Sequence, residues 1–213
     1  MSSSQEWLGA DGVLPAIYHF THIENLPGIL RAGQLDCHRR SDCKVDIANE
    51  DIKAHRMTKR VPVEPGGTVC DYVPFYFAPR SPMLYKKQCD GIQREDIVYL
   101  VAETERVLAG GCRAVVTDGN ARAGRTEFET PANIETFVDW PLMRQRYWSN
   151  TPEDGDRVRR RQAEFLAYQA VSLMLIDRLV VATDQVRSQV GGVLLAEAVS
   201  LPIVVEPDWY FAL

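Results

Sequence analysis

Short apolar and aromatic runs alternate with polar turns along most of the chain. Runs rich in β-branched and aromatic residues predict strands at 17–23, 95–101, 114–117, 178–182 and, at the end, 202–206 with 209–211. Apolar positions at helical spacing instead predict helices at 24–33, 104–108 and 184–198. No internal repeat or linker interrupts this pattern, so we expect one mixed α+β domain over residues 1–213.

The helix predicted at 24–33 has signals at both of its ends. Leu26, Ile29 and Leu30 fall on one face, as expected of a helix packed against a core. Pro27 suits the first turn and Gly33 suits the C-terminal stop. The preceding strand enters this helix through a polar turn, and such a corner is suited to hold a small ligand.

Two long polar stretches, 36–60 and 120–158, break the alternating pattern. The first carries many acids before its basic residues. The second begins with small and basic residues, continues with acidic residues and ends with basic and aromatic residues. Long irregular segments inside a compact domain are typical of loops with a function.

The most unusual composition lies between residues 69 and 85, where aromatic residues are punctuated by Pro74 and Pro79. Because proline cannot donate to a strand ladder, this pattern predicts one or two strands that are interrupted at an edge or an end. Aromatic rings beside Arg80 and Met83 are suited to wall a pocket for a flat ring. The alternative is an ordinary strand whose rings alternate between core and surface.

Glu164 lies where an arginine-rich segment meets an apolar run. A carboxylate at the start of an apolar run is costly unless it is paired, hydrogen-bonded or functional. The neighbouring arginines create a positive field that favours the ionised carboxylate and attracts phosphates. The residues alone leave two interpretations open, a structural ion pair with a nearby arginine or an active-site carboxylate.

Composition narrows the class of protein. The chain has 213 residues, of which 46% are hydrophobic and 25% charged, as in soluble globular proteins. Its net charge of −5 gives no global attraction for nucleic acid, so binding needs a local basic face, for which 53–60 and 144–161 are candidates. The start is polar and no apolar run is long enough to span a bilayer, which predicts a cytoplasmic protein with no membrane partner.

The cysteines give no sign of a disulfide framework or a zinc site. There are five of them at irregular spacing, and no pair has the Cys-x-x-Cys separation, so we expect reduced thiols. Cys37, His38 and Cys43 could contribute to a metal site, but the sequence offers no clear fourth ligand. We therefore predict no metal.

Three blocks of the sequence, taken together, resemble the DarT family. They are His19-Phe20-Thr21-His22-Ile23-Glu24-Asn25-Leu26, then Asp71-Tyr72-Val73-Pro74-Phe75-Tyr76-Phe77 with Pro79-Arg80-Ser81-Pro82-Met83-Leu84-Tyr85, and Gln162-Ala163-Glu164-Phe165-Leu166. DarT is the toxin of the DarT–DarG toxin–antitoxin system and a DNA ADP-ribosyltransferase. The blocks occur in the family's order and span residues 19 to 166.

The resemblance implies an ADP-ribosyltransferase-like fold, with a mixed, mostly antiparallel β core, peripheral helices and a central NAD cleft. It implies a toxin that consumes NAD, releases nicotinamide and attaches ADP-ribose to a base of single-stranded DNA, thymine before guanine. A DarG-type macrodomain antitoxin is the implied partner. An ADP-ribosyltransferase for RNA or protein, and a non-enzymatic nucleotide-binding module, remain as alternatives.

Specific residues follow from the resemblance and from the composition of the loops. Glu164 matches the catalytic glutamate that ends a substrate-recognition loop at about 120–163. Arg56 is chosen as the second catalytic residue from the basic stretch 53–60, at the end of an NAD-binding lid at about 42–56. The residues expected to bind NAD are His19, Phe20, Thr21, Gly28, Leu35, Arg56, Tyr76 and Met83. Those expected to bind DNA are Arg80, Arg144, Arg146, Tyr147, Trp148, Arg157, Arg159 and Arg160.

The implied reaction explains why these residue types are needed. Cleavage of the nicotinamide–ribose bond builds positive charge on the ribose, and an ionised carboxylate such as Glu164 stabilises that charge. A base nitrogen must lose its proton as the new bond forms. The resemblance gives this step to Arg56. Because an arginine normally stays charged, we expect Arg56 to orient NAD or the base and to pass the proton on. A ring nitrogen is reachable only in an unpaired or extruded base, which favours single-stranded DNA.

Overall fold

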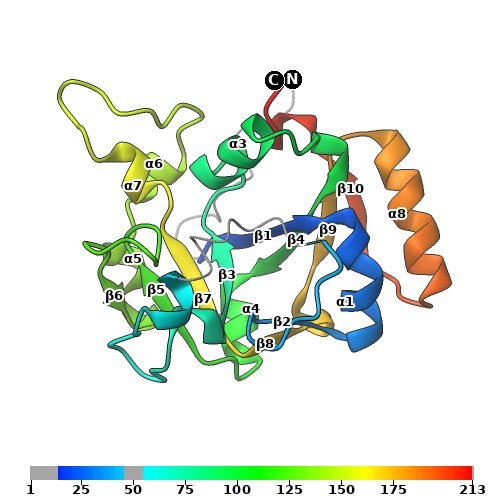
Figure 1. Cartoon of the computed structure of the whole chain (residues 1–213), viewed down its shortest axis with the longest axis horizontal. Helices are drawn as coiled ribbons and strands as arrows, with labels where there is room; N and C mark the ends of the chain where they lie inside the picture. Colours follow the sequence, from blue (N-terminus) through cyan, green and yellow to red (C-terminus); the bar gives the residue numbers. More distant parts are fainter. Residues whose placement is uncertain (1–13, 46–54, 213) are drawn as a thin grey trace.

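The computed structural model describes residues 14–45 and 55–212. Within them, an eight-stranded sheet has the order β10-β9-β4-β1-β3-β7-β5-β6, and β2 pairs with β8 in a separate ribbon (Figure 1). The paired strands are antiparallel except for β9 with β10. The fold confirms the predicted α+β class with a mostly antiparallel core.

The elements follow one another along the chain as short strands and short helices. The strands are β1 (Ala16–His22), β2 (Gln34–Asp36), β3 (Tyr72–Tyr76), β4 (Ile97–Glu103), β5 (Ala114–Thr117), β6 (Phe128–Glu129), β7 (Glu164–Tyr168), β8 (Ala170–Ser172), β9 (Arg178–Val181) and β10 (Ile203–Val205). The α-helices are α1 (Leu26–Ala32), α3 (Pro82–Cys89), α4 (Thr104–Ala109), α5 (Ile134–Phe137), α6 (Trp140–Met143), α7 (Arg157–Arg160) and α8 (Asp184–Ala196). Short 3-10 turns are η1 (Ile23–Asn25), η2 (Val69–Asp71), η3 (Arg94–Asp96), η4 (Pro131–Asn133), η5 (Leu173–Leu175) and η6 (Pro207–Trp209).

Most predicted elements are confirmed, namely β1, β4, β5, β9, β10, α1, α4 and α8. The helix α1 ends as expected, because Gly33 takes the left-handed conformation at φ 68° and its N–H donates to the carbonyl of Leu30 at 3.1 Å. The strand predicted at 209–211 was wrong. A proline begins the turn η6 there, and the hydroxyl of Tyr210 donates to the carbonyls of Ile97 and Val180 at 3.3 and 2.9 Å.

The block at 69–85 contains one strand and one helix. β3 takes its first half, and α3 follows, starting at Pro82 with the hydroxyl of Ser81 accepting from the N–H of Leu84 at 3.1 Å. A serine N-cap followed by proline is a standard helix start, which the aromatic composition of the block concealed.

Both faces of the central strand β4 are buried, which explains its continuous apolar sequence. Val98 and Leu100 belong to a large core with side chains of α1, α4 and α8. Ile97 and Tyr99 belong to a second core with side chains of α3 and η6. The cysteines form no disulfide among the described residues, as predicted. No helix in that part of the chain is long and apolar enough to cross a membrane.

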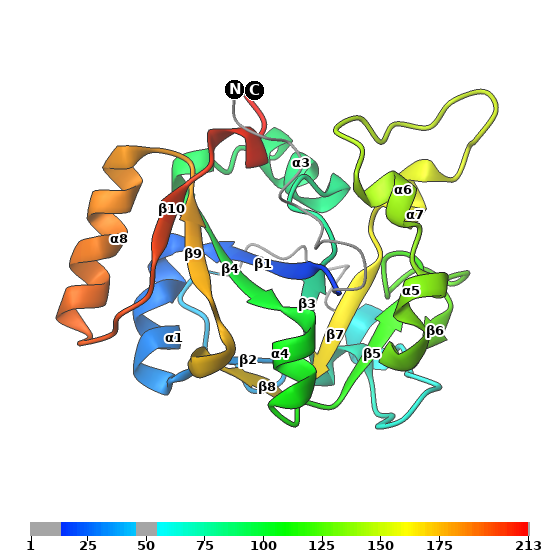
Figure 2. The ribbon, with the colours of Figure 1, turned by 180° about the vertical axis from the view of Figure 1, so that it is seen from behind.

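The sheet divides between β1 and β3. These strands share the single register pair Tyr18–Tyr76, whereas β1 pairs with β4 along its whole length and β3 pairs likewise with β7. One half, β10-β9-β4-β1, carries α8 and α1, and the other half, β3-β7-β5-β6, carries α5, α6 and α7 (Figures 1 and 2). The strands therefore diverge beyond Tyr18, in the middle of the molecule.

Pro74 lies on an inner strand of the sheet, but on one side of that strand the ladder to β1 is interrupted. On one side of β3 it stands opposite Leu166 of β7. Its carbonyl points to the other side, where it is 2.7 Å from Nδ1 of His19 on β1. The nitrogen of a strand residue lies on the same side as its carbonyl, so the missing N–H of Pro74 breaks no ladder bond. The predicted strand edge is thus found at the gap between β1 and β3.

Candidate active site

A cavity of about 510 Å³ opens where β1 and β3 diverge. Every residue predicted to bind NAD lines it, namely His19, Phe20, Thr21, Gly28, Leu35, Arg56, Tyr76 and Met83. These side chains come from β1, α1, β2, β3, α3 and the segment that follows residue 54. The fold thus gathers into one cavity residues that the sequence spreads over more than sixty positions.

Glu164 and Arg56 form a fork beside this cavity. Glu164 begins β7, stands opposite Tyr76 and is 0% exposed. Both of its carboxylate oxygens accept from Arg56, with Nη1–Oε1 at 3.3 Å, Nη1–Oε2 at 3.1 Å and Nη2–Oε2 at 3.1 Å. The N–H of Glu164 donates to Oγ1 of Thr117 on β5 at 3.0 Å. A two-pronged arginine contact and a fixed backbone together leave the carboxylate little freedom.

The charge of Glu164 depends on Arg56 and not on the arginines that precede it in sequence. Burial raises the pKa of the carboxyl above its usual range, and Arg56 opposes that shift. The expected tuning by the adjacent arginine cluster was wrong, because the guanidinium groups of 157–161 are bound to other partners. Glu164 does form an ion pair with an arginine, but the partner is Arg56, 108 positions away in the sequence, and not an arginine of the adjacent cluster.

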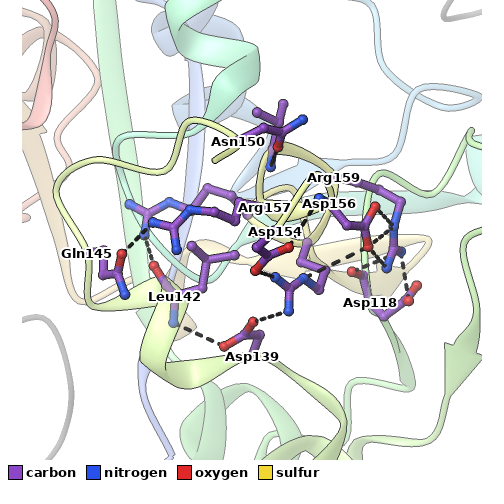
Figure 3. Close-up of polar contacts among 12 residues, drawn as sticks. Asp118, Asp139, Leu142, Gln145, Asn150, Asp154, Asp156, Arg157 and Arg159 are labelled. Atoms are coloured by element: carbon purple, nitrogen blue, oxygen red, sulfur yellow. Dashed lines mark hydrogen bonds and ion pairs between the residues drawn. The ribbon is translucent and has the colours of Figure 1, made fainter. Parts of the chain in front are cut away.

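The arginines before Glu164 are held by aspartates (Figure 3). Arg159 pairs with Asp118 at 2.7 Å and with Asp156 at 2.8 Å. Arg160 pairs with Asp139 at 2.8 Å, and it also reaches Asp154. These pairs join the turn after β5, the helix α7 and the segment between them. They fix the shape of the loop that leads to Glu164.

Two more arginines are buried without a carboxylate partner. Arg161 is 1% exposed and its Nη1 donates to the carbonyls of Leu142 and Met143 at 2.8 and 2.6 Å. Arg80 is 9% exposed, donates to the carbonyl of Tyr210 at 2.6 Å and covers the ring of Phe211 at 4.1 Å. Arg80 and Arg161 therefore hold chain segments in place. A residue that binds DNA presents its charged group to solvent, whereas the guanidinium of Arg80 is buried.

The other residues predicted to bind DNA lie between α6 and α7 or, like Arg157, in α7 itself. Arg144, Arg146 and Tyr147 are exposed, with Tyr147 at 77%. Trp148 packs edge-on against Tyr85, with ring centroids 6.1 Å apart. Arg157 turns inward, donating to Oε1 of Gln145 and to backbone carbonyls (Figure 3). The loop therefore offers two exposed arginines and one exposed ring, while the remaining arginines maintain its conformation.

His19 is a neutral ring at the mouth of the gap between β1 and β3. Burial lowers its pKa from 6.5 to about 4, so the ring carries one proton at neutral pH. Because the carbonyl of Pro74 accepts from Nδ1, that proton lies on Nδ1. Nε2 is then an acceptor, suited to a hydroxyl group in the cavity. Burial and the nearby Glu164 carboxylate raise the pKa of Tyr76, which stays a neutral hydrogen-bond donor.

Asn25 is a site residue that sequence reasoning missed. Its Nδ2 donates to Oγ1 of Thr21 at 3.0 Å and to the carbonyl of Val45 at 2.7 Å, and its Oδ1 accepts from the N–H of Val45 at 2.8 Å. Asn25 thus fastens the chain at Val45 to the corner between β1 and α1. Most of the predicted lid at about 42–56 lies outside the described residues, which include its ends at 42–45 and 55–56.

A second cavity of about 490 Å³ adjoins the first. Its lining residues are Pro82, Met83, Lys86, Asn120, Arg122, Ala123, Asn150, Gly155, Val158, Arg159 and Gln162. Met83 lines both cavities. Sequence reasoning missed Lys86, Arg122 and the three amides, although the small and basic run at 121–125 was a usable signal.

Comparisons with known proteins place these features in context. The DarT family model, described as ssDNA thymidine ADP-ribosyltransferase, matches residues 18–211. A DNA ADP-ribosyl transferase of Thermus sp. (strain 2.9) is 37% identical over 202 residues, which cover 92% of this chain and 95% of the relative. A fusion of a DNA ADP-ribosyl transferase with a DNA ADP-ribosyl glycohydrolase, from Thermosipho africanus, is 26% identical over 200 residues and is matched over 49% of its length.

Solved structures agree with this match. Thermus sp. 2.9 DarT in complex with ADP-ribosylated ssDNA superposes with a TM-score of 0.85 at 34% identity, covering 92% of this chain and 96% of that one. The same protein in complex with NAD+ gives a TM-score of 0.82 at 34% identity, covering 92% and 97%. This chain therefore shares its overall fold with a protein that has been solved with NAD+ and with ADP-ribosylated ssDNA.

Proposed function

The chain belongs to the DarT family, and from this premise we propose that it is a toxin that transfers ADP-ribose from NAD to thymidine in single-stranded DNA. The predicted family and enzyme class are confirmed by the family match. The observation that carries the proposal is the buried Glu164–Arg56 fork beside a cavity lined by every residue predicted to bind NAD. One domain over residues 1–213 is part of the proposal.

The cavity is suited to a dinucleotide in both shape and chemistry. Its polar groups include the Nε2 acceptor of His19 and the hydroxyl of Thr21, both on β1. Phe20 and Tyr76 stack with their rings 5.9 Å apart, and this aromatic wall is suited to the flat nicotinamide. Arg56 supplies positive charge that attracts phosphate. We assign NAD to this cavity.

Glu164 stabilises the charge that develops when the nicotinamide–ribose bond breaks. The bond's electron pair leaves with nicotinamide, and the ribose carbon becomes cationic. An ionised carboxylate in a buried site interacts with this cation more strongly than it would in water. Arg56 keeps Glu164 ionised against the cost of burial and fixes its direction.

The acceptor is a ring nitrogen of thymine that carries a proton. N1 of thymidine is bonded to deoxyribose, so N3 forms the new bond to the ribose carbon and its proton must leave. Arg56 lies between the NAD cavity and the buried Glu164. We assign Arg56 to orient NAD and the base, and to relay the proton of N3 toward the carboxylate.

Exposed side chains of the loop between α6 and α7 hold the strand. Arg144 and Arg146 attract its phosphates, and Tyr147 stacks on an unpaired base. Trp148 is the second predicted stacking residue, on the packed side of the same loop. Arg80, Arg146, Arg157, Arg159 and Arg160 also have partners within the protein, Arg146 with Asp208 at 3.5 Å, and all of these DNA-binding roles stay predictions.

A toxin of this kind requires an enzyme that removes the modification. The matched relative in which a DNA ADP-ribosyl glycohydrolase is fused to the transferase supports such a partner. We propose a DarG-type macrodomain antitoxin for this chain.

Incubation with radiolabelled NAD and matched oligonucleotides tests the activity. We expect label on single-stranded DNA that contains thymidine, and little on the same DNA as a duplex or with every thymidine replaced by cytidine. Label on guanine, RNA or protein, with thymidine left unmodified, would overturn the proposed acceptor. Intact NAD after incubation with every acceptor would favour a non-enzymatic nucleotide-binding module.

The chain offers a matched pair of arginines for testing the catalytic assignment. Arg56→Ala is expected to reduce transfer by about a hundredfold while the fold survives. Arg60→Ala is the control, because Arg60 is exposed and lies four positions away. A loss with Arg60→Ala or His55→Ala that equals the loss with Arg56→Ala would contradict the assignment.

A further inference from the structure

Asn25 stands at the N-cap position of α1, yet its side chain makes no capping hydrogen bond. Asparagine is a preferred N-cap residue, because its side-chain oxygen accepts from an N–H of the first helical turn. Here the buried amide instead makes three other hydrogen bonds, one with Thr21 on β1 and two with the backbone of Val45. The amide of Asn25 therefore serves the corner of the NAD cavity and not the end of the helix.

The backbone of Val45 fixes the direction of this amide. Oδ1 of Asn25 accepts from the N–H of Val45 at 2.8 Å, and Nδ2 donates to the carbonyl of the same residue at 2.7 Å. If the amide were rotated by half a turn, donor would face donor and acceptor would face acceptor, so only one orientation satisfies both contacts. The second N–H of Nδ2 is therefore the group that meets Oγ1 of Thr21 at 3.0 Å.

The hydroxyl of Thr21 consequently accepts on its buried side and can donate only in another direction. Its oxygen receives the N–H of Asn25, so its own hydrogen points away from that amide. Thr21 is 8% exposed and lines the NAD cavity, and no acceptor for this hydrogen is found among residues 14–45 and 55–212. A buried hydroxyl needs such an acceptor, and the cavity is where a ligand can supply it.

The alternation of β1 indicates which part of NAD this hydroxyl meets. Successive side chains of a strand point to opposite faces, so Thr21 shares a face with His19 and not with Phe20, whose ring is assigned to nicotinamide. His19 and Thr21 are about 7 Å apart along the strand. Nε2 of His19 accepts, as a ribose hydroxyl requires, whereas Thr21 donates, as a phosphate oxygen requires. The ADP half of NAD contains both of these groups.

We propose, building on the NAD-binding part of the proposed function, that Asn25 is a positioning residue that directs the hydroxyl of Thr21 toward a phosphate oxygen of NAD. No proton is transferred in this arrangement. Val45 sets the direction of the amide, and the amide sets the direction of the hydroxyl. The hydrogen bond to NAD exists before and after the nicotinamide–ribose bond breaks, so it lowers the KM for NAD and leaves kcat unchanged.

Binding of NAD and of ADP-ribose, measured by calorimetry, tests the hydroxyl. Thr21→Val removes it and keeps the shape, and we expect both ligands to bind about tenfold more weakly, as after the loss of a hydrogen bond to a charged group. Thr21→Ser keeps the hydroxyl and should bind both ligands within about twofold of the wild type. In the transfer assay, Thr21→Val should raise the KM for NAD and leave the KM for single-stranded DNA unchanged.

A double-mutant cycle tests the role of Asn25. In Asn25→Asp the carboxylate accepts the hydrogen of Thr21, which then no longer points into the cavity, so we expect NAD to bind about tenfold more weakly. In the Thr21→Val background the same change should weaken binding less than about twofold, because no hydroxyl remains to be directed. Asn25→Ala serves in the same cycle if Asn25→Asp does not fold, with a smaller loss, because the hydroxyl then rotates freely.

Thr104→Val is the control for the loss of a buried hydroxyl. Thr104 begins α4, outside the lining of the NAD cavity, and its hydroxyl donates to the carbonyl of Pro15. The variant should lower Tm and leave the affinity for NAD unchanged.

Three results would overturn this inference. Wild-type affinity for NAD in Thr21→Val would show that the hydroxyl meets no acceptor. An equal loss from Asn25→Asp in both backgrounds would assign the loss to the new charge or to the chain at Val45. A loss for NAD but not for ADP-ribose would place the acceptor outside the phosphates. A wild type that binds NAD but labels no DNA would instead refute the proposed transfer and leave this inference standing.

Discussion

The two adjoining cavities differ in how they are built. The NAD cavity is formed largely by regular elements, β1, α1 and β3, and its lining mixes acids such as Asp36 with bases such as Arg56. The second cavity lies between α3 and the loop 119–162, and among the residues that the structure describes its lining has cations and amides without an acid. The first is built mainly by regular elements, whereas the second is bordered by a loop that ion pairs such as Arg159–Asp118 hold in shape. Variants that act on one cavity should therefore leave the other intact.

Glu164→Gln is expected to show the largest difference between its effect on catalysis and its effect on ligand binding. The amide keeps the shape and its oxygen still accepts from Arg56, but its NH2 group cannot accept and it has no charge to stabilise the cationic ribose. Transfer to thymidine should fall about a thousandfold. NAD affinity and single-strand affinity should be retained, because neither requires the carboxylate charge. Calorimetry with NAD, fluorescence anisotropy with an oligonucleotide and a transfer assay measure the three quantities.

Thr117→Val is a useful companion variant, because it alters the neighbourhood of Glu164 without changing the carboxylate. It removes the hydroxyl that joins Glu164 to Gly119 but keeps the strand pairing. A loss smaller than that of Glu164→Gln would fit a positioning role for Thr117. Equal transfer by Glu164→Gln and the wild type would break the catalytic assignment.

The next largest effect is expected on stability, on the side of the second cavity. Arg161→Ala removes a guanidinium that donates to the carbonyls of Leu142 and Met143 at the end of α6. The variant removes a donor from both carbonyls, although that of Leu142 still accepts from the N–H of Gln145 at 3.1 Å, and it opens a cavity while it relieves the burial of an unpaired charge. We expect a net loss of about 2 kcal/mol in the free energy of unfolding. Urea denaturation measures it.

Arg144→Ala is the matched control for that measurement, because Arg144 lies in the same loop and is exposed. Its free energy of unfolding should stay within about 0.5 kcal/mol of the wild type. An Arg161→Ala variant as stable as Arg144→Ala would mean that Arg161 does not hold α6 in place.

Most regular elements could be predicted from the sequence because their signals are local, whereas the residues expected to bind NAD followed from the resemblance to DarT. Leu26 and Gly33 mark the helix α1 by spacing and by its stop, and both signals are complete within ten residues. The partner of Glu164 is different in kind. Arg56 is 108 positions away, so residue spacing could not select it, and only the resemblance to DarT did.

The arginine cluster shows why the loop could not be predicted in the same way. Its charge density suggested a surface that grips phosphates, yet Arg159 and Arg160 are bound by aspartates from three separate segments. A basic run in a sequence does not state which acids will meet it after folding. The second cavity escaped prediction for the same reason, because Lys86 and Arg122 converge on it from α3 and from the turn after β5.

A moderate effect of pH is expected on the NAD side. The folded-state pKa of His19, about 4, lies below the unfolded value of 6.5, so the unfolded chain binds the extra proton first. Stability should therefore fall as the pH drops from 6.5 toward 4, by about 1 kcal/mol at pH 5 for a ring that partly faces the cavity. Denaturation midpoints measured between pH 4.5 and 7.5 show the slope.

His19→Gln should flatten that slope, because glutamine keeps a polar side chain near the carbonyl of Pro74 and does not titrate. His38→Gln is the control, since His38 is exposed and its ring is not part of the gap between β1 and β3. If the denaturation midpoints of the wild type and of His19→Gln depend equally on pH, His19 is not the source of this pH dependence.

The smallest effect, and the most selective one, is expected for Asp156→Asn. Arg159 would lose one of its two carboxylate partners but keep Asp118 at 2.7 Å, so the loop should loosen without unfolding. Partly exposed pairs of this kind contribute under about 1 kcal/mol, which corresponds to a rise of about threefold in KM for single-stranded DNA. The value of kcat and the KM for NAD should not change, because Glu164 is held by Arg56 and Thr117.

Asp184→Asn, which removes an exposed pair with Arg187 on α8, is the control for a general effect of lost charge. If Asp156→Asn raised the KM for NAD as much as that for DNA, the two cavities would share one support, and the separation drawn between them would fail.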